Sequence, residues 1–176
     1  MSLRNVFLPV FLLFSGYSMA VDAKIIYGYV EKAILVDKNM TLSAKFDTGA
    51  KSASLSAINI RETKIKGQTY LNFKVPGKTG EVEFTSPYLG KVSIKVRAGE
   101  HLSPQGKTEP IKRPVVLMSI QIGDEMRTIP VNLTNRKRFN YPLLLGRDAI
   151  IAFNGLVDPS HAFLITAKKV EKNEVK

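Results

Sequence analysis

One acidic loop stands out in this sequence as a place where chemistry could occur: Asp47-Thr48-Gly49, followed directly by Ala50. An alternation of polar and apolar residues runs up to Phe46 and stops at this acid, which predicts a carboxylate at the point where a strand breaks into a tight turn. A turn aspartate that bonds its own backbone and a helix N-cap are two ordinary interpretations of such a residue. The third is a reactive carboxylate on a loop, and a second feature has to decide between them.

The second feature lies almost a hundred residues further along the chain, at Leu143-Leu144-Leu145-Gly146-Arg147. Three leucines bounded by a proline and a glycine are too few for a helix, and they predict a short, buried strand. After Gly146 the residue types predict one or two helical turns that end at Asn154-Gly155. The elements expected to position the acid are therefore a strand that ends at Phe46 and a short strand that ends in a glycine.

The two motifs together resemble the retropepsin-like aspartic proteases, in which an Asp-Thr-Gly-Ala loop is followed much later by two apolar residues, then Gly and Arg opening a short helix. In that fold the glycine lets the second strand pack against the catalytic loop, where any side chain would collide. The closer resemblance is to the bacterial branch of the superfamily, often labelled ATP-dependent zinc protease, and it covers about residues 25 to 167. The further segments that carry it are Lys51, Leu55-x-Ala57, Arg113-Pro114-Val115-Val116, Tyr141-Pro142 and Leu156-Val157-Asp158-Pro159-Ser160.

The resemblance implies hydrolysis of peptide bonds by two carboxylates that share a proton. The ionised carboxylate takes a proton from water as general base, and the protonated one polarises the substrate carbonyl as general acid. The chain contains one Asp-Thr-Gly, whereas Asp124, Asp148 and Asp158 suit a turn, a helix start and a proline turn. The second carboxylate is therefore expected to be Asp47 of another copy, on the two-fold axis of a homodimer.

The other site residues take their roles from the same resemblance. Thr48 is expected to brace the paired loops through its hydroxyl, and Gly49 to hydrogen-bond the substrate backbone. Ala50 cannot donate the hydrogen bond to the ionised carboxylates that a Ser could, so activity is expected to extend toward neutral pH. The residues expected to support the loop from behind are Leu144, Leu145, Gly146 and Arg147.

Two positions depart from the family pattern. Lys51 stands where retroviral members carry an acid that clamps the helix arginine, so Arg147 must find another partner. Ser56 stands where bacterial relatives commonly have His. The zinc and ATP of the family label find no support, because no Gly-rich phosphate loop ends in Lys-Ser/Thr, and His101 and His161 lack ligand spacing. No cofactor and no metal is therefore expected.

Two functions from different classes fit these residues. The first is an exported aspartic endopeptidase that hydrolyses a peptide or protein substrate as a homodimer. The second is a catalytically inactive module of the same fold that binds peptides or anionic envelope polymers, since fold does not imply function. Lys51 and Ser56 are the residues that keep the second function open.

The mature chain is rich in strand formers separated by turns, which predicts an all-β domain over residues 24–167, a small closed barrel with one short helix. The predicted strands cover residues 24–36, 40–46, 52–60, 70–75, 81–85, 114–122, 126–133, 143–145, 155–159 and 162–166. A bulge, a bend or a strand end is expected at Ile58, where the apolar parity shifts. In retropepsins a hairpin folds over the substrate as a flap, and two segments compete for that role here: 76–80 and 98–113.

The two ends of the chain are predicted to lie outside this domain. Residues 1–23 combine a short apolar run with small residues at Ala20 and Ala23, the pattern of a secretory signal cleaved after either alanine. An uncleaved anchor is the alternative, although the apolar run is short for a membrane span. Residues 168–176 form a charged tail. The protein is therefore expected to be periplasmic or secreted.

The composition restricts the partners. The absence of cysteine excludes disulfides, thiolate metal sites and a cysteine nucleophile. A formal net charge of +11 favours attraction to anionic envelope surfaces. Nucleic acid is not expected as a partner, because the basic residues are scattered and no aromatic-interleaved recognition motif accompanies them. The basic loop 135–138 is interpreted as a solvated turn, with contact to an acidic partner as the alternative.

Overall fold

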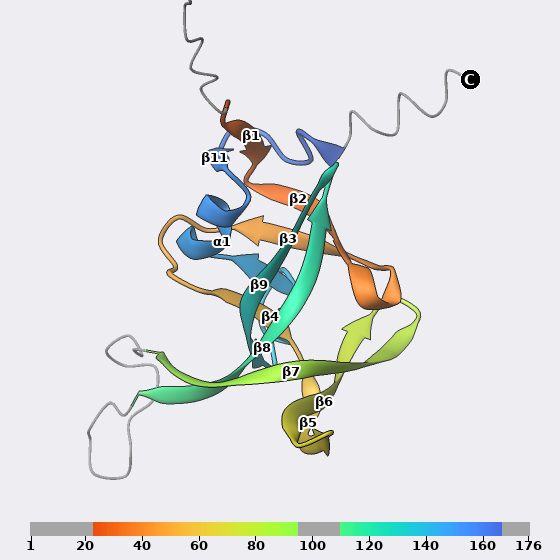
Figure 1. Cartoon of the computed structure of the whole chain (residues 1–176). Helices are drawn as coiled ribbons and strands as arrows, with labels where there is room; N and C mark the ends of the chain where they lie inside the picture. Colours follow the sequence, from red (N-terminus) through yellow and green to blue (C-terminus); the bar gives the residue numbers. More distant parts are fainter. Residues whose placement is uncertain (1–22, 95–109, 167–176) are drawn as a thin grey trace, which may run out of the picture.

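The computed structural model describes residues 23–94 and 110–166 (Figure 1). The predicted signal segment, the charged tail and most of the 98–113 stretch lie outside these residues. None of the helices in the two described ranges has the length and apolar character that a membrane crossing requires.

Strands dominate the described chain, as its alternating apolar and polar runs predict. The strands are β1 (Ile25–Gly28), β2 (Val30–Leu35), β3 (Met40–Phe46), β4 (Ala53–Ser56), β5 (Ile58–Ile65), β6 (Gln68–Gly77), β7 (Gly80–Ile94), β8 (Ile111–Ile122), β9 (Glu125–Thr134), β10 (Leu143–Leu145) and β11 (Gly155–Asp158). A 3-10 turn η1 (Val36–Lys38) joins β2 to β3, and the helix α1 (Arg147–Ala152) follows β10.

Six strands close into a barrel. The order β2-β3-β10-β4-β9-β8 returns to its start because β2 also pairs with β8. The short strand β10 is the central piece, since it pairs in parallel with β3 and antiparallel with β4. The all-β class and the small closed barrel with one short helix are thereby confirmed. The parallel pairing carries the ends of β3 and β10 to the same edge of the barrel.

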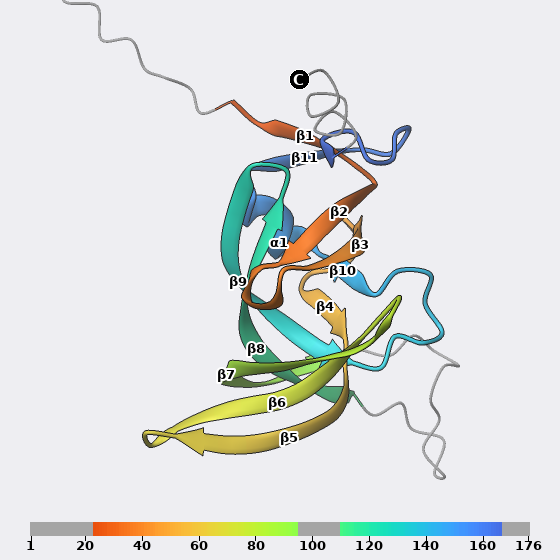
Figure 2. The same ribbon diagram turned by 90° about the vertical axis from the view of Figure 1, so that its right-hand side faces the viewer.

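Three strands extend beyond the barrel from β8, in the order β7, β6 and β5 (Figures 1 and 2). The predicted hairpins are confirmed, with β6 paired to β7 and β8 paired to β9, although β7 is much longer than the predicted strand 81–85. The predicted strand 52–60 is divided into β4 and β5 at Ala57. The expected irregularity at Ile58 is present, because the β5–β6 register shifts between Ile58 and Arg61, and Asn59 has a left-handed backbone with φ of 55°.

The core packs aromatic rings against the underside of the Asp47 loop. Tyr27 is fully buried, and its ring stacks on Phe46 with 4.8 Å between centroids. Phe153, which follows α1, meets Tyr27 edge to face at 6.3 Å. Phe46 is the last residue before the acidic loop, so this cluster fixes the end of β3 from the side of the core.

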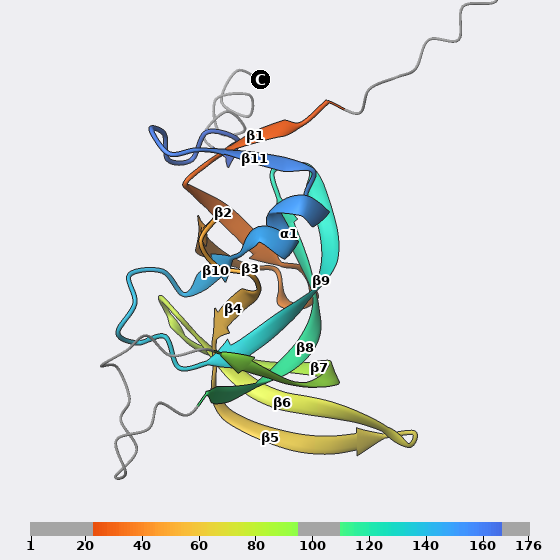
Figure 3. The same ribbon diagram turned by 90° about the vertical axis from the view of Figure 1, so that its left-hand side faces the viewer.

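Two sequence predictions about the chain ends of the domain are wrong. The predicted strand 24–36 is broken at Tyr29, and its first part, β1, forms a separate two-stranded sheet with β11 (Figure 3). Residues 162–166 are not a strand, and Phe163 has a left-handed backbone with φ of 57°. The physical reason is Glu31, whose carboxylate is fully buried and draws surrounding backbone N–H groups toward itself.

The buried Glu31 carboxylate is saturated with hydrogen bonds. Its Oε1 accepts from the N–H groups of Gly28 at 2.8 Å and Ile165 at 3.1 Å. Its Oε2 accepts from the N–H of Thr166 at 3.2 Å and from the Thr166 hydroxyl at 2.7 Å. These contacts turn the chain after β1 and hold residues 162–166 against the barrel without a strand.

Candidate active site

The Asp47 loop lies at the barrel edge where β3 and β10 end together. The backbone N–H of Asp47 donates to the carbonyl oxygen of Leu145 at 2.9 Å, which continues the parallel pairing by one residue. Asp47 is half-buried, whereas Thr48 and Gly49 are exposed. The carboxylate therefore stands on a loop fixed from the barrel side and open on the other side.

The orientation of the carboxylate is set within the loop. The backbone N–H of Gly49 donates to Asp47 Oδ1 at 3.0 Å, and the N–H of Ala50 donates to the Asp47 carbonyl at 3.2 Å. Within the described residues, Asp47 Oδ2 accepts no hydrogen bond. One carboxylate oxygen is thus held by the turn and the other is available to a water, a substrate or a second carboxylate.

Gly146 permits the contact between β10 and the loop. A Cβ atom on Gly146 would lie 2.7 Å from the carbonyl carbon and oxygen of Lys51 and 2.7 Å from the carbonyl oxygen of Ser52. All three are backbone atoms, which cannot move aside as a flexible side chain can. The close approach that the sequence assigns to this glycine is therefore present in the structure.

Arg147 braces the loop through backbone carbonyls. Its Nη1 donates to the carbonyl oxygens of Thr48 at 3.0 Å and Gly49 at 3.3 Å, and its own N–H donates to the Ala50 carbonyl at 2.9 Å. Arg147 therefore binds the main chain of the loop, in place of the acid that position 51 does not provide. Arg147 lies behind Asp47, as the second motif predicts.

Lys51 has its own partner on the helix. Its Nζ lies 2.7 Å from Asp148 Oδ2, with the two side chains 75% and 56% exposed. An ion pair with this degree of exposure contributes about 0–1 kcal/mol to the stability of the fold. The N–H of Asp148 also donates to the Lys51 carbonyl at 3.0 Å. The loop and the helix are therefore joined by main-chain bonds that do not depend on the residue type at position 51.

Arg136 interacts electrostatically with Asp47 and with a second arginine, Arg113, and the sequence predicted neither arginine as a site residue. Burial, and then the charge of Arg113, lower the pKa of Arg136 to about 10, while the Asp47 carboxylate acts in the opposite direction. Burial also lowers the pKa of Arg113, whose Nε is buried without a hydrogen-bond partner among the described residues. Arg136 is therefore an electrostatic neighbour of both Arg113 and Asp47.

The basic loop 135–138 is the predicted solvated turn at Asn135, Lys137 and Arg138, which are exposed, but not at Arg136. Arg136 is only 6% exposed, and its Nε donates to the Tyr141 carbonyl at 3.1 Å. Its backbone N–H donates to Ser56 Oγ at 3.2 Å, and its guanidinium lies 4.4 Å from the Phe139 ring centroid. Ser56 therefore anchors the residue that brings positive charge toward Asp47. A charge run in the sequence gives no sign that one of its members turns inward.

The chain matches the family described as "Retropepsin-like aspartic endopeptidase RimB" over residues 26–168, which is most of its length. It belongs to this family. A solved relative of the same shape is the crystal structure of protein Lpg0085 (DUF785), of unknown function, from Legionella pneumophila subsp. pneumophila str. Philadelphia 1. Its sequence is 58% identical to this chain, and the TM-score is 0.69. The match covers 82% of this chain and 100% of the Legionella chain.

Curated relatives of this RimB-like chain carry a different kind of name. A probable alpha-L-glutamate ligase of Shewanella pealeana is 31% identical over 72% of this chain, and one of Parasynechococcus marenigrum is 30% identical over 77%. The chain spans about a quarter of the length of these relatives, 26% and 28% respectively. The match thus concerns one part of a longer protein.

The RimB-like barrel also separates the two segments that compete for the role of a flap. The turn after β6 lies at the opposite side of the barrel from the Asp47 loop, and a Cβ on Gly77 would lie 2.8 Å from Met40 at the start of β3 (Figure 1). The paired ends of β7 and β8, by contrast, extend on the side of the Asp47 loop (Figure 1). The 76–80 turn is therefore not placed over the Asp47 loop, and most of the 98–113 stretch lies outside the described residues.

One further polar cluster lies near the end of the domain. Asp158 Oδ2 is 2.9 Å from His161 Nδ1, and Ser160 donates to Asp158 Oδ1 from both its N–H and its hydroxyl. The hydrogen bonds from Ser160, and then that from His161, lower the pKa of Asp158. Since Ser160 and Asp158 both contact the same ring nitrogen, the cluster lacks the relay order of a catalytic triad. Within the described ranges, no three His, Cys, Asp or Glu side chains group as metal ligands.

Proposed function

We propose that this chain is an aspartic endopeptidase whose active form is a homodimer with two Asp47 carboxylates at its centre. The observation that carries the proposal is the geometry of the Asp47 carboxylate. The Gly49 N–H binds its Oδ1, its Oδ2 is open, and Gly146 and Arg147 brace the loop. Such bracing keeps a carboxylate in a fixed position, which general acid and base chemistry requires.

The reaction proposed for the dimer uses no group beyond the two carboxylates and water. The ionised Asp47 takes a proton from the water as its oxygen bonds to the peptide carbonyl carbon. The protonated Asp47 of the other copy donates its proton to the carbonyl oxygen. When the C–N bond breaks, the leaving amine takes the proton that the pair holds. A hydroxyl of the tetrahedral intermediate gives its proton to the pair as the carboxylic acid product forms, which restores the shared proton.

The dimer surface is proposed to lie beside the loop, around α1 and the β1–β11 sheet. Ile26 and Leu156 are partners across that sheet and are 51% and 53% exposed. Ile151, on the helix that follows Arg147, is 73% exposed. Large apolar side chains gathered in this way are typical of a surface that is covered in the functional assembly.

Acidic peptides are the proposed substrates. The Arg136 guanidinium interacts with the charge of Asp47 and with that of Arg113, and among the described residues no carboxylate forms an ion pair with either arginine. The curated relatives are named glutamate ligases, so a peptide rich in glutamate is the natural candidate. Glutamate side chains would supply the negative charge that the buried arginines lack.

Export through residues 1–23 is also part of the proposal, and it rests on the apolar run and small residues of that segment. The test is N-terminal sequencing of the protein recovered from cell fractions. A new N-terminus at residue 21 or 24 in the periplasm or medium would support export. An intact Met1 in the cytoplasm would contradict it.

The experiment that tests the activity separates the protein by mass and assays each fraction. The substrates are a mixed peptide library and a matched pair of peptides, oligoglutamate and oligoglutamine of equal length, between mildly acidic and neutral pH. The variants are Asp47→Asn and, as a matched control, Asp37→Asn, which makes the same chemical change in the exposed turn η1.

We expect cleavage to follow the dimer fraction, to favour oligoglutamate, and to be lost in Asp47→Asn but kept in Asp37→Asn. Ile151→Glu should lower both the dimer fraction and the specific activity without unfolding the monomer, because Ile151 contributes little to the core. A stable monomer that cleaves nothing yet binds the acidic peptide would replace the peptidase with the binding module of the same fold.

A further inference from the structure

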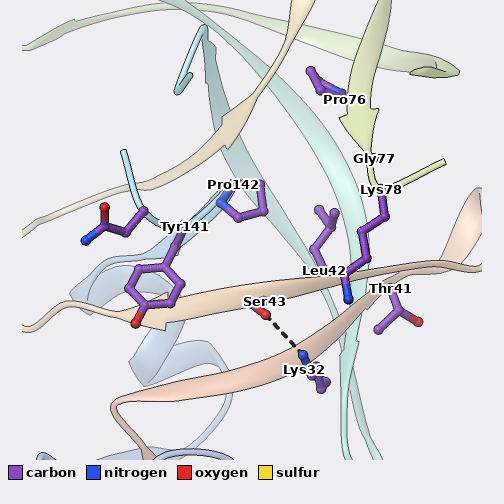
Figure 4. Close-up of a pocket in the computed structure, with 10 residues that line it drawn as sticks. Lys32, Thr41, Leu42, Ser43, Pro76, Gly77, Lys78, Tyr141 and Pro142 are labelled. Atoms are coloured by element: carbon purple, nitrogen blue, oxygen red, sulfur yellow. Dashed lines mark hydrogen bonds between the residues drawn. The ribbon is translucent and has the colours of Figure 1, made fainter. Parts of the chain in front are cut away.

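A cavity lies toward the other end of β3 from Asp47. It has a volume of about 540 Å³ and is bounded by the first half of β3, the turn after β6 and the segment before β10 (Figure 4). The buried Leu42 and the rings of Pro76, Tyr141 and Pro142 form its apolar part. A water occupies about 30 Å³ of liquid, so the space is large enough for a small organic molecule.

Two ammonium groups enter this cavity from different elements. Lys32 is the cross-strand neighbour of Ser43, and its Nζ donates to Ser43 Oγ at 3.2 Å. The Lys32 Nζ also lies 4.6 Å from the Phe163 ring centroid, which holds the side chain in place. Lys78 reaches into the same space from the turn after β6, toward Thr41 and Leu42 (Figure 4).

The cavity holds positive charge without a matching acid. None of the residues that line it is Asp or Glu, and within the described ranges neither Lys32 nor Lys78 forms an ion pair. The nearest acids along the chain are already engaged, since Glu81 lies 3.2 Å from Lys74 and Glu31 is buried under residues 165–166. Each ammonium has three donors, and a single hydroxyl satisfies one of those of Lys32.

We propose that this cavity is a binding site for a small organic acid with two or more carboxylates. Lys32 and Lys78 would each pair with one carboxylate, and the hydroxyls of Ser43 and Tyr141 would bond the remaining oxygens. The carbon skeleton would lie on Leu42 and the two prolines. Carboxylates are favoured over phosphate because the lining supplies neither a guanidinium fork nor a helix N-terminus, the usual phosphate ligands.

A bound acid would also link two parts of the fold. Lys78 belongs to the β6–β7 turn, which lies outside the closed barrel, whereas Lys32 belongs to barrel strand β2. The ligand would therefore join the hairpin to the barrel, at a place separated from the Asp47 loop by the length of β3. The site is independent of the proposed peptidase activity.

The test is a titration of the full chain with citrate, followed by backbone amide NMR signals at constant ionic strength. Inorganic phosphate, acetate and glycerol serve as comparison ligands. We expect saturable citrate shifts at Leu42, Ser43 and Gly77, with weaker binding of the three comparison ligands. Lys32→Met and Lys78→Met should each weaken citrate binding about tenfold, the value of one charge-assisted hydrogen bond. The control Lys64→Met removes an exposed lysine outside the cavity.

Three results would overturn the proposal. Shifts spread evenly over the basic surface would mean nonspecific attraction, and unchanged affinity in the Lys32→Met and Lys78→Met double variant would exclude these ammonium groups. Phosphate binding tighter than citrate would reject the carboxylate assignment. Asp47→Asn should leave citrate affinity unchanged, so failure of this site and failure of the peptidase proposal are separate outcomes.

Discussion

Replacement of Gly146 by Ala tests whether β10 positions the acidic loop. The new Cβ would lie 2.7 Å from three backbone atoms of Lys51 and Ser52, whereas an ordinary contact begins near 3.4 Å. The loop and β10 must therefore separate by about 0.7 Å. That displacement would lengthen bonds that now measure 2.9 Å, from Asp47 N–H to Leu145 and from Arg147 N–H to Ala50, beyond the usual limit of about 3.2 Å.

The expected cost is a loss of about 2–4 kcal/mol in the free energy of unfolding, from overpacking and two weakened hydrogen bonds. Cleavage should fall by about 100-fold, since a displacement approaching 1 Å misplaces the carboxylate. Urea unfolding and peptide cleavage at a temperature where both proteins are folded measure the two effects.

The matched control is Gly67→Ala, in the turn after β5. Gly67 has φ of 82° and open space around its missing Cβ, so Ala there adds backbone strain of about 1–2 kcal/mol without touching the site. We expect this variant to lose stability and keep its activity. The packing argument fails if Gly146→Ala is no less stable than Gly67→Ala and cleaves as the wild type does.

Three further variants probe contacts elsewhere. Burial raises the pKa of Tyr27 to about 12, so folding favours the neutral phenol. The free energy of unfolding should therefore fall by about 3 kcal/mol as the pH rises from 10 to 12. Tyr27→Phe should remove this alkaline loss, as measured by urea unfolding. Glu31→Gln places an amide against backbone N–H donors and should cost at least about 2 kcal/mol, and a loss under about 0.5 kcal/mol would contradict the anchoring role. Ala50→Ser should move the pH optimum of cleavage downward, whereas an upward or absent shift would show that residue 50 does not reach the carboxylates.

Local signals in the sequence were sufficient for the barrel and for the second motif. Alternating apolar residues and glycine-rich turns predict the β6–β7 and β8–β9 hairpins, because the residues in and beside a turn determine both its type and the register of the strands. The close approach at Gly146 followed from the resemblance to the retropepsin-like proteases, in which this glycine packs against the acidic loop. The leucine strand and the Asp-Thr-Gly loop carried that resemblance.

The contacts between distant segments were not predictable. Arg113 and Arg136 lie on β8 and after β9, and nothing in either segment indicates that Arg136 approaches both Arg113 and Asp47. The break at Tyr29 arises because Glu31 binds residues 165–166, more than a hundred positions away. In each case a charged residue is buried against a partner that tertiary packing brings near it. Charged residues are usually exposed, so a sequence pattern predicts exposure for them.

The loop can tolerate Lys51 because its support comes from the main chain. Arg147 donates to two carbonyl oxygens, and carbonyls are present whatever side chain follows Ala50. The acid that retroviral relatives use at this position is therefore not needed to hold the arginine. Since the Lys51–Asp148 pair is exposed and weak, the proposed dimer would need another surface to hold it together. The exposed apolar side chains Ile26, Ile151 and Leu156 are the ones proposed for that surface.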